Sequence, residues 1–273
     1  MGLPRSTPSA LDRANAQFWD ELCGTTLARQ IGIRDHSAES LHRFDRAYLD
    51  FYPYLLRRVP IDTLRGKRVL EVGLGYGTLG QKIIEAGAQY SGLDIAAGPV
   101  RMMNERMRMA GASGEVRQGN MLDCPFADAS FDCVVSIGCF HHTGDARRCI
   151  DETWRVLKPG GSAYLMVYNL FSYRRWFGWP LQTLRALATA GRPASESQRA
   201  AYDANTAGAA APETEFFSIR ELRRMLSSFS RAAVVKENCE DFRVGGRLVV
   251  SRAGLLPLVG PLAGLDLYVE AVK

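Results

Sequence analysis

The feature that most constrains this chain is a dense run of glycines that follows a short apolar stretch. The run reads Val69-Leu-Glu-Val-Gly-Leu-Gly-Tyr-Gly-Thr-Leu-Gly80. Glycine adopts backbone conformations that other residues avoid, and its missing side chain lets a ligand approach the main chain closely. A strand that turns into a helix through such a run is typical of an open α/β sheet, where ligands bind beyond the carboxyl ends of the strands. We therefore expect an α/β protein with a binding site at this turn.

Strand-like and helix-like segments alternate along most of the chain. Helical periodicity covers four segments, at residues 78–86, 99–110, 145–157 and 219–229. Short apolar segments typical of strands lie at residues 67–72, 90–93, 115–118, 131–137, 162–168, 232–236 and 265–272. Repeated strand–helix units indicate a parallel sheet with helices on both faces. The expected fold is α/β, a doubly wound Rossmann-like sheet of seven strands, with an N-terminal helical cap and an insertion after the fifth strand.

This pattern divides the chain into four parts. Residues 1–62 are helical and aromatic, and they either pack on the main domain or cap a ligand cleft. Residues 63–169 form the Rossmann-like core, and residues 216–273 complete it. Residues 170–215 break the strand–helix rhythm, first with aromatic and basic residues and then with a stretch rich in Ala, Gly and Ser. Long irregular insertions of this kind are usually lids, binding elements or disordered segments, so we interpret this segment as an insertion or a lid.

An acidic residue at the end of the second predicted strand narrows the choice of ligand. Asp94 stands where a carboxylate can accept hydrogen bonds from both hydroxyls of a ribose, so the pattern favours an adenosine-containing cofactor. Residues 75–80 also match the dinucleotide pattern GxGxxG, which binds a pyrophosphate at a helix N-terminus. A carboxylate at Glu71 would repel that group. It would suit an ammonium group instead.

The chain resembles the class I S-adenosylmethionine-dependent methyltransferases, and the resemblance covers residues 66–168. Glu71–Gly77 is similar to the first motif of that family, and Tyr90–Ile95 to its ribose-binding strand end. Further similarity lies at Gly119–Phe126 and in the turn at Arg155–Gly161. These motifs are weak one by one, but they occur in the order and spacing of the family.

The resemblance implies S-adenosyl-L-methionine as the cofactor, with S-adenosyl-L-homocysteine as the product. The glycine turn would hold the methionyl part, Glu71 its ammonium, Asp94 the ribose and Ile95 the adenine. Asn120 replaces an acidic residue of many members, but its carbonyl oxygen can still accept a hydrogen bond from the adenine amine. The full set of expected cofactor contacts is Glu71, Gly73, Leu74, Gly75, Gly77, Asp94, Ile95, Asn120, Met121, Leu122, Ile137 and Gly138.

The catalytic candidates follow the fourth and fifth predicted strands. Methyl transfer from a sulfonium is an in-line displacement, so the protein mainly aligns the reactants, and a base helps when the acceptor is a hydroxyl. His141 and His142 are candidates for this base or for contact with the acceptor, although they could also merely shape their loop. Tyr168 lines the acceptor pocket or simply ends its strand. The cysteines form no CxxC pair and have no histidine at zinc spacing, so we expect no metal site.

Composition limits the classes of partner. The net charge of +5 is mild and the arginines are scattered, unlike the basic stripe of a nucleic-acid binder, so we expect no nucleic-acid partner. The favoured function is methyl transfer to an O, N or C atom of a small-molecule acceptor in secondary metabolism. One alternative is a lipid-linked or glycan precursor at a membrane surface, with Trp176, Phe177 and Trp179 as an interfacial patch. Another is a non-catalytic module that only binds the cofactor.

The sequence favours a cytoplasmic protein. The apolar run 253–265 contains two prolines and is shorter than the ~18 residues of a membrane span, so we expect no integral membrane span. The first residues lack the apolar region of a signal peptide, and the six cysteines are read as free thiols in a reducing compartment. The oligomeric state stays open, with a homodimer as one alternative.

Overall fold

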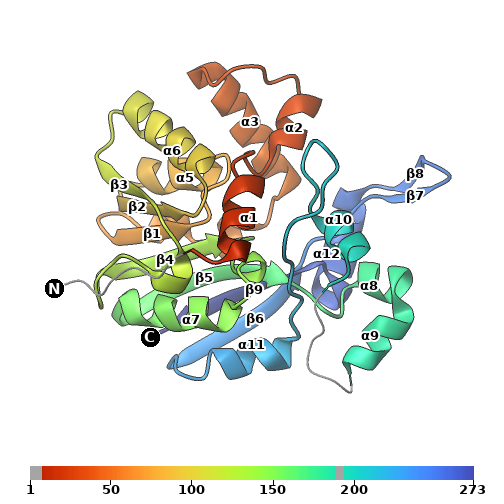
Figure 1. Ribbon diagram of the computed structural model, residues 1–273. Helices are drawn as coiled ribbons and strands as arrows, with labels where there is room; N and C mark the ends of the chain where they lie inside the picture. Colours follow the sequence, from red (N-terminus) through yellow and green to blue (C-terminus); the bar gives the residue numbers. More distant parts are fainter. Residues whose placement is uncertain (1–7, 188–193) are drawn as a thin grey trace.

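The computed structural model describes residues 8–187 and 194–273. Part of the predicted lid, residues 188–193, lies outside the described residues. Helices pack on both faces of one large sheet, and a separate hairpin projects from one side (Figure 1). The helices are α1 (Ala10–Phe18), α2 (Thr25–Gln30), α3 (Ala38–Phe51), α4 (Leu55–Arg58), α5 (Thr78–Glu85), α6 (Ala97–Ala110), α7 (Ala146–Val156), α8 (Tyr173–Gly178), α9 (Pro180–Ala186), α10 (Glu196–Tyr202), α11 (Ile219–Met225) and α12 (Arg252–Ala263), with short 3-10 turns η1 (Ile61–Thr63), η2 (Met121–Asp123) and η3 (Phe140–His142). The strands are β1 (Arg68–Val72), β2 (Gln89–Asp94), β3 (Gly114–Gln118), β4 (Phe131–Ile137), β5 (Leu157–Tyr168), β6 (Arg231–Glu237), β7 (Phe242–Val244), β8 (Arg247–Val250) and β9 (Asp266–Val272).

The main sheet has seven strands in the order β3-β2-β1-β4-β5-β9-β6. The pairs from β3 to β5 are parallel, as expected, but β9 runs antiparallel to both β5 and β6. The expectation of a purely parallel sheet is therefore wrong at this edge. The register explains the reversal, because Glu237 at the end of β6 pairs with Asp266 at the start of β9. The intervening residues leave and re-enter the sheet at the same end, and such a return produces an antiparallel neighbour.

Local signals in the sequence explain where the core elements begin and end. Gly77 adopts a left-handed conformation at the start of α5, and Gly111 does so at the end of α6. Ser218 and Glu221 form a capping box at the start of α11. All seven strands of the sheet overlap the predicted segments, although β5 begins at Leu157, five residues before its predicted start. The sequence did not predict the hairpin β7–β8 or the helix α12.

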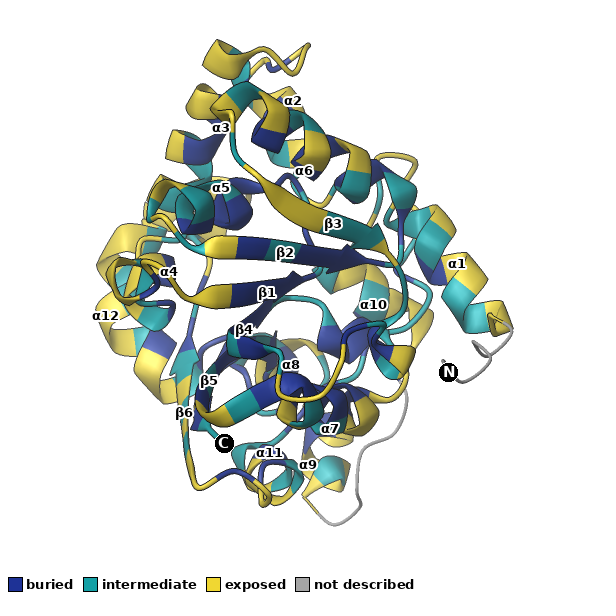
Figure 2. Ribbon diagram, turned by 90° about the vertical axis from the view of Figure 1, so that its left-hand side faces the viewer, coloured by how far each residue is buried: buried dark blue, intermediate teal, exposed yellow. Residues whose placement is uncertain are grey.

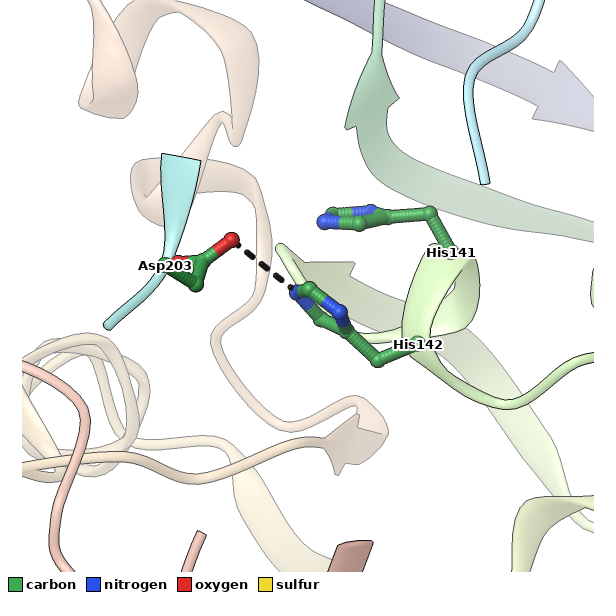
Figure 3. A group of neighbouring side chains, drawn as sticks. All are labelled: His141, His142 and Asp203. Atoms are coloured by element: carbon green, nitrogen blue, oxygen red, sulfur yellow. Dashed lines mark ion pairs between the residues drawn. The ribbon is translucent and has the colours of Figure 1, made fainter. Parts of the chain in front are cut away.

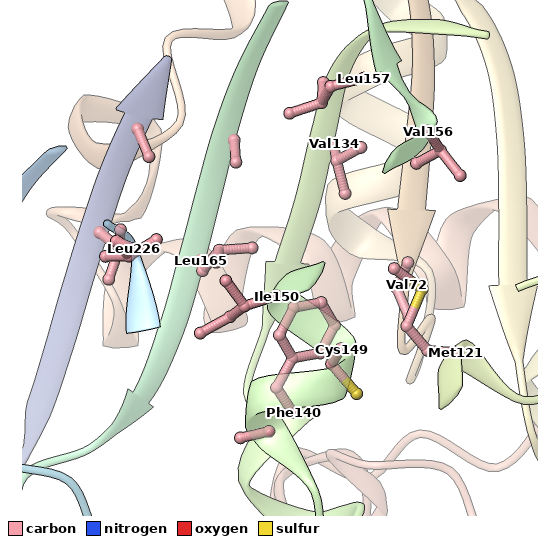
Figure 4. Close-up of a cluster of buried hydrophobic side chains, with 14 of the residues drawn as sticks. Val72, Met121, Val134, Phe140, Cys149, Ile150, Val156, Leu157, Leu165 and Leu226 are labelled. Carbon is pink, nitrogen blue, oxygen red and sulfur yellow. The ribbon is translucent and has the colours of Figure 1, made fainter. Parts of the chain in front are cut away.

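Two hydrophobic clusters hold the helices to the two faces of the sheet. Val134 and Val135 are neighbours on β4, and both are fully buried on opposite faces because side chains alternate along a strand. The Val134 side packs against residues of α7 and α11, part of which Figure 4 shows. The Val135 side packs against α4, α5 and α6. In Figure 2 the central strands are accordingly buried along most of their length.

The strand order places a crevice at the carboxyl ends of β1 and β4, because the chain direction across the sheet reverses between these two strands. Two segments outside the sheet meet near this crevice. Asn15 of α1 donates a hydrogen bond to the carbonyl oxygen of His142 at 2.7 Å. The hydroxyl of Thr206, after α10, donates to Glu21, after α1, at 2.8 Å.

Within residues 8–187 and 194–273, no helix combines the length and apolar character needed to cross a membrane.

Candidate active site

A cleft of about 1100 Å³, its open mouth included, lies at the carboxyl ends of β1, β2 and β4. Its lining contains all but one of the residues expected to contact the cofactor, namely Glu71, Gly73, Leu74, Gly75, Gly77, Asp94, Ile95, Asn120, Met121, Ile137 and Gly138. Leu122 is the exception, because its side chain packs against the main hydrophobic cluster. Its backbone N–H donates to the side-chain oxygen of Asn120 at 2.9 Å, which fixes the turn in that orientation.

In the glycine turn, Gly73 and Gly77 lie too close to neighbouring side chains to carry a side chain of their own. Gly73, Gly75 and Gly77 have φ values of +80°, +50° and +78°, a region that favours glycine. A Cβ atom on Gly73 would lie 2.6 Å from Cys139 Cβ, and one on Gly77 would lie 2.8 Å from Arg106 Cδ. The main chain of the turn therefore forms the wall of the cleft by itself.

A buried ion pair supports this turn from behind. The Arg106 guanidinium donates two hydrogen bonds to the Asp45 carboxylate, each at 2.8 Å, and its Nε donates to the Tyr76 carbonyl oxygen at 2.8 Å. The Thr78 hydroxyl also donates to Asp45, at 2.6 Å. These charge-assisted bonds tie α3 and α6 to the turn. No short motif in the sequence pairs Asp45 with Arg106, so the sequence alone predicts a role for neither residue.

Asp94 is held in place by the backbone of two neighbouring turns. Its Oδ2 accepts a hydrogen bond from the Leu74 N–H at 2.8 Å, and its Oδ1 accepts one from the Ala96 N–H at 2.9 Å. An ionised carboxylate can accept about four hydrogen bonds. Burial raises the pKa of Asp94 to about 6, although the backbone donors oppose that shift. The side chain thus keeps acceptor positions available on the side of the cleft.

Glu71 is a second buried carboxyl group on the same cleft. It accepts a hydrogen bond from the Tyr90 hydroxyl. Burial raises the pKa of Glu71 to about 8, against the effect of the Tyr90 bond, and the charge of Asp94 raises it further. Two desolvated carboxyl groups on one cavity favour a cationic ligand with hydroxyl groups and disfavour a pyrophosphate. The donor set therefore fits S-adenosylmethionine better than a dinucleotide.

The N-terminal segment contributes side chains to the cleft that the sequence analysis did not single out. Asp12, Asn15, Trp19 and Cys23 line it. Asp12 Oδ1 accepts a hydrogen bond from Asn120 Nδ2 at 2.8 Å, so both the nitrogen and the oxygen of the Asn120 amide have a partner, and the oxygen keeps one acceptor position. These contacts join residues more than a hundred positions apart, so no local pattern could have revealed them. Side chains of α1 and of the segment after it thus line the cleft, whereas residues of α3 and α4 pack on the main domain.

The two histidines after β4 have different surroundings. His142 lines the cleft, and its Nδ1 donates a hydrogen bond to the Glu213 carbonyl oxygen at 2.7 Å. Its Nε2 then keeps the lone pair and lies 3.5 Å from Asp203 Oδ2 (Figure 3). His141 is fully buried and does not line the cleft. Among the described residues neither ring nitrogen of His141 finds a hydrogen-bond partner, and burial holds its pKa well below the usual value.

Tyr168 lies behind the histidines rather than in the cleft wall. Its ring centroid is 4.0 Å from that of His141, and its hydroxyl donates to Asp203 Oδ2 at 2.9 Å. Burial raises the pKa of Tyr168 well above the usual value, so the hydroxyl stays protonated. Asp203 comes from the insertion, directly after α10, and the sequence analysis did not single it out. His142, Asp203 and Tyr168 thus form one chain of polar contacts.

His141, His142 and Asp203 also raise the question of a metal. Their potential ligand atoms lie within 4.8 Å of one another. Metal–ligand distances of ~2.0–2.2 Å place two donors on one ion at most ~4.4 Å apart, so the three ligand atoms lie near the upper limit for sharing an ion. Tyr168 already bonds the Asp203 oxygen that would face the ion. As placed, the cluster suits a hydrogen-bonded acceptor better than a metal ion.

Comparison with known proteins identifies the core of this chain. Residues 70–165 match the methyltransferase domain family. The chain is 33% identical over 119 residues to a phthiotriol/phenolphthiotriol dimycocerosates methyltransferase of Mycobacterium tuberculosis, a match that covers 43% of this chain and 42% of that protein. It is 31% identical over 120 residues to a demethylmenaquinone methyltransferase of Tropheryma whipplei, covering 44% and 48%. The matched stretch thus spans less than half the length of these curated relatives.

Solved structures show the same fold. The 1,6-didemethyltoxoflavin-N1-methyltransferase of Burkholderia thailandensis, determined with 1,6-didemethyltoxoflavin and S-adenosylhomocysteine bound, superposes with a TM-score of 0.52. The two chains are 16% identical, and the match covers 100% of this chain and 93% of that one. A methyltransferase of Methanosarcina mazei gives a TM-score of 0.53 at 20% identity, covering 77% and 93%. Residues 70–165 of this chain thus match a methyltransferase domain, and the chain has the fold of the S-adenosylmethionine-dependent methyltransferases.

Proposed function

We propose that this protein transfers a methyl group from S-adenosylmethionine to a small organic acceptor bound beside His142. One observation carries the proposal, namely that a single cleft is lined both by the glycine turn with Asp94 and by His142. When bound, the cofactor supplies an electrophilic methyl group on a positively charged sulfur. All other contributions come from the residues of the chain.

The side of the cleft formed by the glycine turn, Glu71 and Asp94 is called here the cofactor-binding wall. In this proposal it holds the ligand through groups of complementary charge. Asp94 accepts hydrogen bonds from the ribose hydroxyls, and Glu71 neutralises the ammonium group. Ile95 and Met121 cover the adenine, and Asn120 accepts a hydrogen bond from its amine. The main chain from Gly73 to Gly77 and the residues Ile137 and Gly138 surround the methionyl part. The fit of the two buried carboxyl groups to a cationic ligand supports these assignments.

The side of the cleft at His142, which we call the acceptor-binding wall, positions the acceptor and provides a group that accepts a proton. Alignment of an acceptor with the reacting group can supply ~7–11 kcal/mol of the barrier. The bond from His142 Nδ1 to the Glu213 carbonyl leaves Nε2 free to accept a proton. Asp203, 3.5 Å from Nε2, would stabilise the imidazolium that results, and Tyr168 keeps Asp203 in place. A base is needed only for an acceptor that keeps its proton near neutral pH, so we propose a hydroxyl acceptor.

The nature of the acceptor follows from the lining and is supported by the relatives. Trp19 and Tyr48 add aromatic surface to the cleft, which suits an apolar compound. The relatives named above are described as methyltransferases of a mycobacterial lipid and of demethylmenaquinone, and a third, from Gibberella zeae, as a sterol 24-C-methyltransferase. One further relative is a ribosomal RNA methyltransferase. The mild net charge of +5 favours the apolar small molecule over RNA.

Two measurements test this function. Calorimetry with S-adenosylmethionine and with NAD checks the cofactor, and we expect binding of the first only. Release of S-adenosylhomocysteine across a panel of apolar hydroxyl compounds checks transfer. Binding of NAD in preference to S-adenosylmethionine would refute the cofactor. Tight cofactor binding without release on any acceptor of the panel would favour the non-catalytic module.

A further inference from the structure

Three helices and one hairpin at the end of the molecule away from β3 expose large apolar side chains. On α8 and α9, Phe177 is 86% exposed and Leu181 is 70% exposed, and on α12 Leu258 and Leu262 are 67% and 73% exposed. The hairpin β7–β8 stands apart from the main sheet (Figure 1), and its exposed apolar residues are Phe242, Val244, Leu248, Val249 and Val250. A two-stranded hairpin is marginally stable alone in water. Exposure of this extent on adjoining elements marks an interaction surface.

These elements meet at one corner of the chain, residues 239–241. Glu240 pairs with Arg174 of α8 at 2.5 Å, and its N–H donates to the Tyr173 hydroxyl at 2.9 Å. Asp241 accepts a hydrogen bond from the N–H of Arg252, the first residue of α12, at 2.8 Å. Strand β7 follows directly at Phe242. Residues 239–241 thus connect α8, α12 and the hairpin. We call α8, α9, α12 and the hairpin together the apolar–basic surface.

The segments of this surface carry a net positive charge. Residues 173–187 and 242–263 contain six arginines and no aspartate or glutamate. Arg175 is buried, and the arginines that are at least partly exposed are Arg174, Arg185, Arg243, Arg247 and Arg252. The two acids at the corner, Glu240 and Asp241, are engaged by Arg174 and Arg243. Apolar side chains among cationic ones are typical of segments that lie in the interface of a membrane with anionic lipids.

We propose that the apolar–basic surface docks on a bilayer that contains anionic lipids. The acceptor of the methyl transfer would then be a molecule dissolved in that bilayer. This statement about the acceptor rests on the proposed function, whereas the docking itself does not. Helix α12 has 12 residues and therefore a length of about 18 Å, too short to cross the ~30 Å apolar layer, so it lies in the interface. The insertion that carries α8 and α9 also carries Asp203 of the acceptor-binding wall, which links the docking surface to the cleft.

A second copy of the chain is the competing occupant, and the charge argues against it. A two-fold symmetric contact places a surface patch against itself. The arginines of one copy would then face those of the other, and Glu240 and Asp241 compensate only two of them in each copy. Lipid phosphates provide the opposite charge without that cost.

The test is co-sedimentation with vesicles of phosphatidylcholine mixed with phosphatidylglycerol, and with vesicles of phosphatidylcholine alone. We expect binding to the anionic vesicles that weakens as salt increases, and weak binding to the neutral ones. The double variant Phe177→Asp/Leu258→Asp should lower the partition constant at least about tenfold. Arg243→Gln and Arg247→Gln should each lower it about fivefold, the effect of one basic residue at an anionic surface.

Matched controls separate surface docking from a general effect of charge. Ser113→Asp adds one of the two negative charges of the double variant, on the exposed turn after α6, and Arg108→Gln removes an exposed arginine of α6. Both should leave vesicle binding unchanged. Calorimetry with S-adenosylhomocysteine on every variant shows that the cleft is intact, and it reports on the proposed function independently of vesicle binding.

Two results would overturn the proposal. One is equal sedimentation of the wild type with and without anionic vesicles. The other is a dimer in light scattering that the Phe177→Asp/Leu258→Asp variant dissociates, because the surface would then belong to a second copy. A protein that binds vesicles but not the cofactor would refute the proposed function alone.

Discussion

The two walls of the cleft are built in different ways. The cofactor-binding wall is mostly main chain, and its acidic groups Glu71 and Asp94 lie on neighbouring strands whose register is fixed by the pairing of β1 with β2. The acceptor-binding wall is made of side chains that come from distant segments. Asn15 contacts the backbone of His142 from α1, and Asp203 approaches its ring from the insertion. The first wall is a property of the sheet, whereas the second depends on how the outer segments pack.

This difference predicts which measurement each substitution will change. Changes in the cofactor-binding wall should alter cofactor affinity or folding. Changes in the acceptor-binding wall should alter turnover and leave cofactor affinity nearly constant. A substitution in one wall that changed the property assigned to the other would show that the division is wrong.

The largest effect is expected from His142→Ala. Loss of a positioned general base usually costs about 10²–10⁴-fold in rate. We expect a decrease of this size in kcat for a hydroxyl acceptor, with little change in the affinity for S-adenosylmethionine. Steady-state kinetics and calorimetry on the same preparation measure both quantities.

The control for this substitution is His42→Ala, which removes an exposed histidine of α3. It should leave kcat unchanged. His141→Ala provides a second comparison, because His141 is buried and should change stability more than rate. Equal kcat for the wild type and His142→Ala would exclude the base.

Gly73→Ala should have the next largest effect, on folding. Left-handed backbone costs a residue with a side chain about 1–2 kcal/mol, and crowding against Cys139 adds about 1–3 kcal/mol. We expect the free energy of unfolding in urea to fall by about 2–5 kcal/mol. Gly32→Ala is the matched control, since Gly32 has a φ of +71° but nothing within 4 Å of an added Cβ. If both variants lose the same stability, contact with Cys139 is irrelevant.

Asp94→Ala should weaken cofactor binding about tenfold to a hundredfold. It removes a charged hydrogen-bond acceptor, which is worth about 1.5–3 kcal/mol, and it also releases the N–H groups of Leu74 and Ala96. Asp94→Asn keeps one oxygen, so its affinity for the cofactor should lie between those of the wild type and of Asp94→Ala. Calorimetry measures these affinities, and an unchanged affinity in Asp94→Ala would contradict the assignment to ribose.

The same comparison explains what could be predicted from the sequence. The strand–turn–helix at Gly73–Gly77 and the acid at Asp94 are local features, so their pattern predicts both the fold and the lining of one wall. His142 was found because it follows a strand whose end faces the cleft. The predicted roles of His141 and Tyr168 relied on the same rule, and that of Leu122 on the family resemblance, but these side chains point into the core or toward Asp203 instead.

The remaining features depend on long-range packing. Asp203 becomes relevant only because the insertion folds back over His142, which is 61 positions earlier in the chain (203 minus 142). The Asp45–Arg106 pair likewise joins two helices with no shared motif. The hairpin β7–β8 was missed because its two strands are short and lie outside the main sheet.

The smallest expected effect is a pH dependence that belongs to the cofactor-binding wall alone. Burial raises the pKa of Glu71 to about 8, so the side chain is mostly protonated at pH 7 and half ionised at pH 8. A cationic ligand favours the ionised form, so its affinity should rise about fivefold between pH 7 and pH 8. Asp94, with a pKa of about 6, is already mostly ionised across that interval and contributes little.

The variant Glu71→Gln tests this assignment. It should bind the cofactor more weakly at pH 8, and its affinity should no longer depend on pH between 7 and 8. Stability provides an independent check, because native Glu71 keeps a proton between pH 4.5 and about 8 that the unfolded chain has released. The free energy of unfolding of the wild type should therefore fall as pH rises across that range, and Glu71→Gln should flatten this decline. An unchanged pH slope in both measurements would show that the cleft does not rely on Glu71 for the positive charge of its ligand.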